Sequence, residues 1–143
     1  MRVAFETAKQ TPAGDVPVGA VVFAADGEVV GRGVNRREAN CDPTAHAEVE
    51  AIRQAVRVYG DGWRLSGCEL VVTLEPCAMC AGALQAARVG SVVFGAFEPK
   101  TGACGSLIDV LRAPTAPFTP QVRGGVLEEE CAALLRNFFG DLR

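Results

Sequence analysis

The sequence is poor in several features that would each have indicated a class of protein. It contains one histidine and two lysines among 143 residues, and Asp and Glu together outnumber Lys and Arg by 17 to 14. The resulting net charge of −3 argues against a protein that coats nucleic acid without specificity, because such proteins carry a basic footprint. No apolar run approaches about 18 residues, so no transmembrane helix is predicted.

The amino-terminal residues also lack the pattern of a signal peptide. Glu6 and Lys9 lie where the apolar core of such a peptide would be, which predicts a cytoplasmic protein. In that compartment, closely spaced cysteines indicate metal binding or catalysis more often than disulfides. The length of 143 residues and the composition, 49% hydrophobic and 22% charged, are typical of one globular domain, expected over residues 1–143.

The pattern of apolar and turn-forming residues predicts both helices and strands. Helices are expected over residues 2–11, 45–58 and 77–87, as a short piece over 107–111, and from 128 onward. Strands are expected over 17–23, 28–34, 70–74, 91–96 and 121–126. Thr44 is the expected N-cap of the second helix. A helix and a hairpin followed by alternating helices and strands predict an α/β fold, a three-layer α/β/α sandwich with a mixed five-stranded sheet.

Two short segments carry the strongest chemical signal. They are His46-Ala47-Glu48 and Pro76-Cys77-Ala78-Met79-Cys80, each at the first turn of a predicted helix. An H-x-E segment together with P-C-x-x-C is typical of the zinc-dependent nucleobase deaminases. Cys77 and Cys80 are three residues apart, on one face of a helix whose amino end favours thiolates. With His46 they supply three ligands, which leave the fourth tetrahedral position of a catalytic zinc ion for water.

Glu48 is the expected catalytic residue, a proton shuttle that does not bind the metal. On an ideal helix, two residues are separated by about 200°, so His46 and Glu48 share a site only if it lies over the end of the helix. The remaining cysteines occur singly, at positions 41, 68, 104 and 131. They are predicted to be small buried hydrophobic residues, with Cys41 the least clear because it lies in the loop before the site.

Several motifs resemble those of the bacterial tRNA-specific adenosine deaminases, within the cytidine-deaminase-like superfamily. The resemblance runs from about Val16 to Leu142. Its motifs are Asp42-Pro43-Thr44-Ala45-His46-Ala47-Glu48, Thr73-Leu74-Glu75-Pro76-Cys77-Ala78-Met79-Cys80-Ala81-Gly82-Ala83, Val93-Phe94-Gly95-Ala96, Lys100-Thr101-Gly102-Ala103-Cys104-Gly105-Ser106-Leu107 and Phe138-Phe139.

The resemblance implies a cytidine-deaminase-like fold and a reaction. Adenosine at the wobble position of an arginine tRNA with an ACG anticodon is converted to inosine by attack of zinc-bound hydroxide on adenine C6, and ammonia leaves. It implies one zinc ion per chain, no organic cofactor, and a homodimer whose two subunits contact the tRNA anticodon loop. His46, Cys77 and Cys80 correspond to the zinc ligands and Glu48 to the proton shuttle. The substrate-binding positions that it implies are Asn35, Ala47, Lys100 and Phe138.

Three of these positions have structural alternatives. Asn35 can be a turn residue at the end of a strand, Lys100 a solvated side chain, and Phe138 part of the apolar face of the last helix. Many members of the family carry a basic tail, whereas this chain ends at Asp141-Leu142-Arg143. Attraction of RNA phosphates is therefore expected from a local patch, with candidates Arg36, Arg37, Arg64, Arg88 and Lys100.

Two other functions are consistent with the same motifs. One is deamination of a free base or nucleoside, such as guanine or cytosine and cytidine, which the missing basic tail favours. The other is a non-catalytic RNA-binding partner subunit, from which the proton shuttle would be expected to be lost. The presence of Glu48 argues against this second alternative.

Overall fold

The structure, a computed structural model, describes residues 1–142, in which four helices and five strands alternate. In chain order they are α1 (Arg2–Ala8), β1 (Gly19–Phe23), β2 (Val29–Val34), α2 (Ala47–Tyr59), β3 (Glu69–Leu74), α3 (Ala78–Ala86), β4 (Ser91–Ala96), β5 (Gln121–Arg123) and α4 (Glu128–Asp141). None of the helices among these residues is long and apolar enough to cross a membrane.

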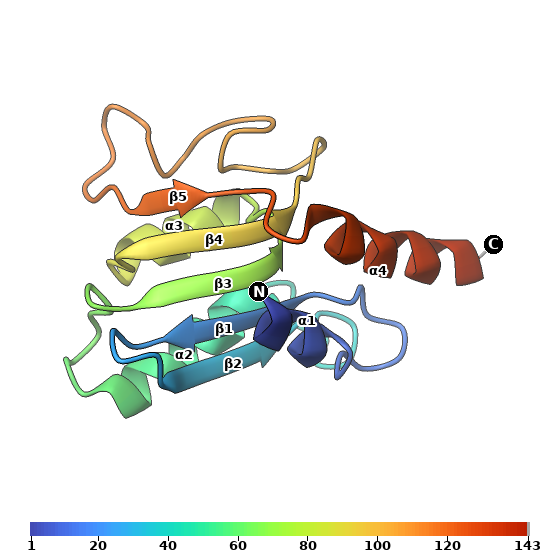
Figure 1. The fold of residues 1–143 in the computed structure, drawn as a ribbon, viewed down its shortest axis with the longest axis horizontal. Coiled ribbons are helices and arrows are strands. Elements are labelled where there is room, and N and C mark those ends of the chain that lie inside the picture. Colours follow the sequence, from blue (N-terminus) through green and yellow to red (C-terminus); the bar gives the residue numbers. More distant parts are fainter. Residues whose placement is uncertain (143) are drawn as a thin grey trace.

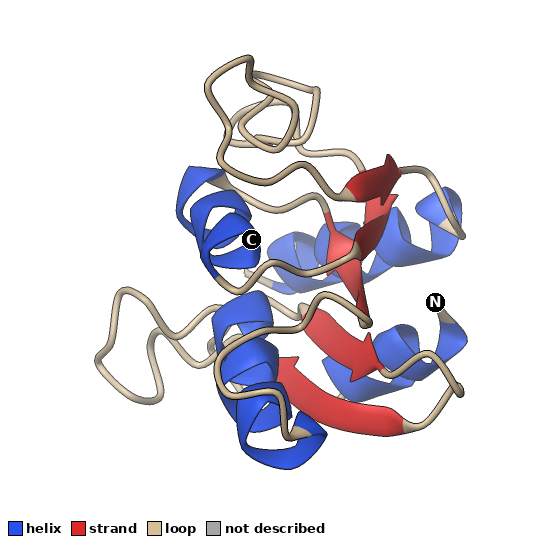
Figure 2. Ribbon diagram, turned by 90° about the vertical axis from the view of Figure 1, so that its left-hand side faces the viewer, coloured by secondary structure: helices blue, strands red, loops and turns tan. Residues whose placement is uncertain are grey.

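The strands form one mixed sheet in the order β2-β1-β3-β4-β5. Strand β1 pairs antiparallel with both β2 and β3, whereas β3, β4 and β5 are parallel (Figure 1). Helices α2 and α3 cover one face, and α1 and α4 lie on the other, so that helices stand on both sides of the sheet (Figure 2). The predicted three-layer sandwich with a mixed five-stranded sheet is confirmed.

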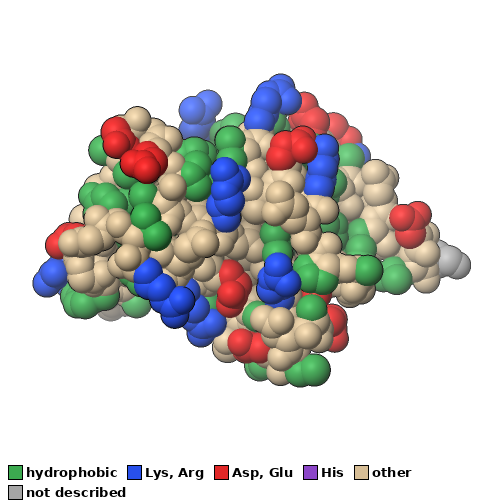
Figure 3. Space-filling model, turned by 90° about the horizontal axis from the view of Figure 1, so that it is seen from below, with side chains coloured by type: hydrophobic (Ala, Val, Ile, Leu, Met, Phe, Trp, Pro, Cys, Tyr) green, Lys and Arg blue, Asp and Glu red, His purple; other side chains and the backbone are tan. Residues whose placement is uncertain are grey.

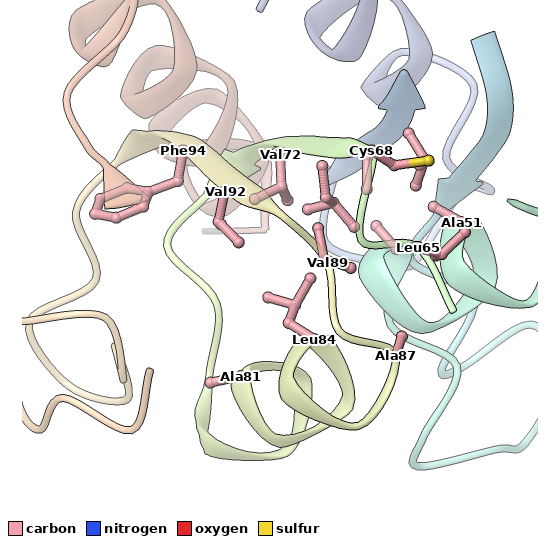
Figure 4. Packing of buried hydrophobic residues seen from close by; sticks show 14 of the residues in the cluster. Ala51, Leu65, Cys68, Val72, Ala81, Leu84, Ala87, Val89, Val92 and Phe94 are labelled. Carbon is pink, nitrogen blue, oxygen red and sulfur yellow. The ribbon is translucent and has the colours of Figure 1, made fainter. Parts of the chain in front are cut away.

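The core is largest between the sheet and the α2–α3 layer. Val72, Val92 and Leu84 are fully buried there, and Figure 4 shows side chains from strands and helices converging on this region. Val71 of β3 points to the opposite face, where it packs with Ala4 of α1. Both faces of β3 are covered, in keeping with the three consecutive apolar residues Leu70, Val71 and Val72 at its centre. Its carboxyl end lies beside that of β4.

The start of α2 differs from the prediction. Thr44 is not the N-cap; its hydroxyl donates to Asp42 Oδ1 at 2.8 Å, and the same carboxylate oxygen accepts from the Thr44 amide. The helix begins at Ala47, and His46 occupies the N-cap position in an extended conformation (φ −79°, ψ 153°). A local turn of the chain at Asp42 therefore delays the helix and leaves His46 outside it.

The predicted helix over residues 107–111 is wrong, because this segment forms turns and a short bridge between Cys104 and Asp109. Its backbone groups have other partners. The amides of Cys104 and Ser106 donate to the Glu75 carboxylate, and the Val110 amide donates to the Ala103 carbonyl. The Val110 amide, bonded to a carbonyl seven residues earlier, cannot form the regular i to i−4 bond of a helix.

Other differences concern the ends of elements and one cysteine. Helix α1 ends at Ala8 and not at residue 11, and β5 ends at Arg123, just before Gly124 and Gly125. Cys68, Cys104 and Cys131 are buried as expected, but Cys41 is exposed. Its φ of 47° places it in the left-handed region, within the loop that precedes His46.

Candidate active site

Four segments of the chain meet at one end of the strands, where β2, β3 and β4 finish and β1 begins. Because β1 runs antiparallel to β2 and β3, the residues before β1 lie beside those that follow β2 and β3. Leu74 and Ala96, the last residues of β3 and β4, are paired, so the segments that follow these strands are also neighbours. This end of the strands therefore brings together Val18, Asn35, Glu75 and Glu98, as well as the amino ends of α2 and α3.

The three predicted metal ligands lie in contact at this end of the strands. His46 and Cys77 are the N-cap residues of α2 and α3, and Cys80 lies in the first turn of α3. His46 Nδ1 is 3.5 Å from Cys80 Sγ and 3.7 Å from Cys77 Sγ, and the three ligand atoms all lie within 4.8 Å of one another. Zinc bonds of about 2.0–2.1 Å to nitrogen and about 2.3 Å to sulfur give an N–S separation of roughly 3.5 Å in a tetrahedral site. The arrangement fits a zinc ion.

The pKa values of the two thiols are shifted in opposite directions. A hydrogen bond with Cys80, and a further one with His46, lowers the pKa of Cys77 to about 4. The same contact with Cys77, together with burial, raises the pKa of Cys80. The hydrogen bond with Cys77 also raises the pKa of His46. One thiolate is thus available at neutral pH, and binding of a metal cation by both sulfurs displaces the proton of the second.

Glu48 lies beside the ligands and is 4% exposed. Burial raises its pKa to about 7, which suits a group that both accepts and donates a proton near neutral pH. Since His46 is extended and outside the helix, the 200° separation expected on an ideal helix does not apply, and the two side chains reach the same site. The predicted placement over the end of the helix is therefore found.

A cavity of about 240 Å³ opens over the ligands. Its lining includes Asn35, Ala47 and Glu48, as expected, together with Thr101 and Phe139. The Asn35 side chain donates to the Val16 carbonyl at 3.1 Å and accepts from the Arg37 amide at 3.2 Å. Asn35 therefore stabilises the turn after β2 and also lines the cavity. Its predicted role as a turn residue does not exclude its predicted role as a substrate contact.

Two other predicted substrate positions lie outside the cavity lining. Lys100 is exposed, on the turn next to Thr101. Phe138 is half-buried and packs edge to face against Phe139, with 5.2 Å between ring centroids. In α4 it is Leu135 and Phe139 that line the cavity. These two are four residues apart and share one face of the helix, whereas Phe138 contributes through its contact with Phe139.

Glu75 is a site residue to which the sequence analysis assigned no role. It is 2% exposed and lines the cavity. Its carboxylate accepts from the amides of Glu98 (2.9 Å), Cys104 (3.1 Å) and Ser106 (3.0 Å), and also from the Ser106 hydroxyl. Burial acts to raise the pKa of Glu75, but these hydrogen bonds outweigh it and lower the pKa. Glu75 thus clamps the loop over residues 98–106 beside the ligand Cys77; the signal available in the sequence was a carboxylate directly after a buried strand.

The candidate basic residues do not form one patch. Arg37 lines the cavity and pairs with Glu38. Arg64 and Arg88 instead flank the exposed Trp63 ring, at 4.7 and 5.8 Å from its centroid, and line neither the cavity nor its mouth.

The sheet, the two helix ends and the His/Cys/Cys cluster define a zinc-dependent deaminase. The chain belongs to the family described as the cytidine and deoxycytidylate deaminase zinc-binding region, whose model matches residues 1–96. It is 46% identical over 138 residues to the tRNA-specific adenosine deaminase of Bacillus subtilis, which covers 96% of this chain and 84% of that protein. It is 52% identical over 129 residues, 90% of this chain, to the tRNA(Ile)-lysidine synthase of Deinococcus radiodurans, and spans only 22% of that protein.

Solved structures share the fold. A structure from a study of A-to-I editing by tRNA:A34 deaminases superposes with a TM-score of 0.86 at 42% identity, over 94% of this chain and 97% of the other. A guanine deaminase from Bacillus subtilis superposes with a TM-score of 0.60 at 37% identity, over 67% of this chain and 61% of the other. The proteins to which this chain is similar are therefore named for both tRNA and free-base substrates.

Proposed function

We propose that this chain deaminates adenosine to inosine at the wobble position of an arginine tRNA with an ACG anticodon, in a zinc-dependent hydrolysis. The observation that carries the proposal is the His46–Cys77–Cys80 cluster beside the buried Glu48 at the base of a cavity. Support for the substrate comes from the tRNA-specific adenosine deaminase of Bacillus subtilis, which is 46% identical along most of its length.

In this mechanism His46 Nδ1 and the sulfur atoms of Cys77 and Cys80 hold the zinc ion. When bound, zinc supplies the nucleophile by lowering the pKa of water toward 7. The Glu48 carboxylate accepts a proton from water and donates it to the adenine ring nitrogen as the remaining hydroxide adds to C6. It then accepts the proton of the added hydroxyl and passes it to the amino group, which leaves as ammonia when its bond to C6 breaks. Water is consumed and the C6 amino group is replaced by oxygen. The pKa of about 7 lets Glu48 act in both directions.

The remaining residues position the substrate. Asn35 and Ala47 line the cavity and are the proposed contacts of the target nucleoside. Lys100 and Phe138 lie outside its lining and are suited to nucleotides that flank the target. An anticodon loop favours this reaction, because its bases are already unpaired and cost little to extrude into a cavity.

The proposed active unit is a homodimer of the domain spanning residues 1–143, of which the last lies outside the described residues. Three exposed apolar side chains, one on α3 and two on the loop between β4 and β5, support an interface between copies, namely Met79 (37% exposed), Leu107 (60%) and Ile108 (49%). Light scattering coupled to size exclusion measures the mass directly. A monomer at micromolar concentration contradicts the dimer and leaves the chemistry untouched.

Incubation of zinc-loaded protein with the arginine tRNA bearing ACG tests the proposed function. Inosine is expected at the wobble position, measured by nucleoside mass spectrometry. A matched tRNA with G in place of the wobble A controls for deamination elsewhere. No inosine at enzyme excess would rule out the proposed substrate.

The second candidate is deamination of a free base or nucleoside. The structural similarity to guanine deaminase favours it, as does the net charge of −3. Competition among guanine, cytosine, cytidine and the anticodon stem-loop separates the two functions, because each product is distinct by mass. Turnover of a free base in preference to the stem-loop would favour this second candidate. Turnover of any of them would contradict a non-catalytic RNA-binding subunit.

A further inference from the structure

A second hollow, distinct from the active-site cavity, lies along the edge strand β2 and helix α2. Its volume is about 710 Å³, and four arginines line it. They are Arg32 of β2, Arg36 in the turn that follows, and Arg53 and Arg57 of α2. We refer to the hollow lined by these four residues as the arginine groove. Figure 3 views the molecule from the side of β2 and α2, where Lys and Arg side chains are spread over the surface.

Most of the arginines that line the groove have no acidic partner within the described residues. Within residues 1–142, Arg32, Arg36 and Arg57 form no ion pair. One carboxylate lines the groove, that of Glu50, and it pairs with Arg53 at 3.2 Å. Four positive charges against one negative charge leave a local excess of three in a protein of net charge −3. Such an excess favours a polyanionic ligand.

The groove is joined to the active-site cavity by one short segment. Val34 and Arg36 line the groove, whereas Asn35 and Arg37 line the cavity. Residues 34–37, which are the last residue of β2 and the segment leading into the next turn, thus form a wall between the two hollows. A strand whose base occupies the cavity has its neighbouring phosphates at the top of this wall, with the groove directly beyond it.

We propose that the arginine groove binds the phosphate backbone of the RNA strand on one side of the target nucleoside. This inference rests on the proposed action on tRNA. Guanidinium groups are suited to phosphates because their planar fork donates two parallel hydrogen bonds. Proteins that bind single-stranded nucleic acid commonly combine such a positively charged groove with a pocket for the base. The groove thereby supplies a local positive patch for RNA on a protein whose net charge is negative.

The double variant Arg36→Gln/Arg57→Gln tests the groove. These two guanidinium groups make no hydrogen bond or ion pair within the described residues, so their loss leaves no partner unsatisfied. Arg123→Gln is the matched control, because Arg123 is an exposed, unpaired arginine on β5, at the opposite edge of the same sheet. Each zinc-loaded protein is titrated with labelled anticodon stem-loop from 0.05 to 0.3 M salt.

Each lost phosphate contact lowers the slope of log affinity against log salt by about 0.7 on a single strand. The double variant is therefore expected to lower the slope by about 1.4 and to weaken binding roughly 25-fold at 0.1 M salt. Arg123→Gln is expected to match the unchanged protein. Should the double variant fail to fold, by circular dichroism and zinc content, Arg57→Gln alone is expected to lower the slope by about 0.7.

The outcomes separate this inference from the proposed function. If the unchanged protein deaminates the stem-loop and the groove variants keep its affinity and salt slope, the groove does not bind RNA and the proposed function stands. If the unchanged protein neither binds nor deaminates RNA, both are overturned. A change of slope in Arg123→Gln that is half of the change in the double variant, which removes twice the charge, would show a nonspecific charge effect and would also overturn the groove.

Discussion

Two buried glutamates next to metal ligands show how surroundings set the role of a side chain. Glu48 lies two residues after His46, and Glu75 lies two residues before Cys77. Burial dominates at Glu48 and raises its pKa to about 7, whereas three amides and a hydroxyl stabilise the charged form of Glu75 and lower its pKa. The first is thereby suited to proton transfer, and the second is a permanently charged clamp.

Replacement of Glu48 tests proton transfer. Glu48→Gln keeps the size of the side chain but removes the carboxylate, so turnover is expected to fall by about 10²- to 10⁴-fold. Zinc content, measured by mass spectrometry, is expected to stay at one per chain, because Glu48 is not a ligand. Glu6→Gln, at an exposed position on α1, is the control. Turnover within tenfold of the unchanged protein would contradict the assignment.

Replacement of Glu75 tests the clamp. Glu75→Gln turns one acceptor oxygen into a donor that faces two other donors, so the free energy of unfolding is expected to fall by about 2–3 kcal/mol. Ser106→Ala removes one of the four hydrogen bonds and is expected to cost about 1 kcal/mol. Urea unfolding measures both. Faster amide hydrogen exchange confined to the loop over residues 98–106 is expected in each, and uniform exchange would count against the clamp.

At the scale of elements, the site depends on how closely α2 packs on β2. Gly31 and Gly33 of β2 face Ala51, Ala55 and the backbone at Ala47. A side chain at either glycine would collide with the backbone of α2, and a shift of this helix would move His46 and Glu48 together. The small residues of these two elements therefore set the position of one metal ligand and the proton shuttle.

A pair of glycine substitutions tests this packing. Gly33→Ala is expected to lower the free energy of unfolding by about 1–3 kcal/mol, because the added methyl group overpacks a backbone contact. Gly140→Ala lies in α4 with open space around it and is expected to be neutral or to add up to about 1 kcal/mol, since alanine favours helix. Thermal unfolding measures both. Equal effects at the two positions would refute the close approach.

At the scale of the molecule, the site joins parts of the chain that are far apart in sequence. The ligands come from α2 and α3, the clamped loop follows β4, and the cavity is completed by α4, which projects from the same end of the strands (Figure 1). A bound zinc ion links the first two of these elements. Its binding energy therefore contributes to the stability of the fold.

Removal of the metal tests this linkage. A zinc concentration about 1,000 times its dissociation constant is expected to raise the free energy of unfolding by about 4 kcal/mol over chelator-treated protein. Cys80→Ala lacks one ligand, and its stability is expected to depend far less on zinc. Chemical unfolding in zinc and in chelator measures the difference. If zinc stabilised Cys80→Ala as much as the unchanged protein, the zinc ion that stabilises the fold would lie at another site.

The sequence predicted the ligands and the proton shuttle because they lie in short motifs at helix ends, where spacing alone constrains geometry. It also predicted the layers of the fold from the order of elements. It did not predict the turn at Asp42, the clamp at Glu75 or the absence of a helix over residues 107–111. The clamp and the missing helix depend on hydrogen bonds to partners that only folding brings near, such as Glu75 for Ser106. The turn at Asp42 instead depends on local bonds from Thr44, which compete with the predicted capping role of that residue.

The same distinction separates chemistry from recognition in this protein. The sequence by itself predicted the proposed chemistry, since His46, Glu48, Cys77 and Cys80 lie in two short motifs typical of a zinc site with a proton shuttle. Only the tertiary structure decided which residues line the cavity, where Phe139 and Thr101 lie next in sequence to the predicted contacts Phe138 and Lys100. It also decided which arginines lie beyond the wall at residues 34–37. The physical reason is range, because the spacing within a motif is set by neighbours in the chain, whereas a cavity or a surface is made by segments that meet only when the sheet has formed.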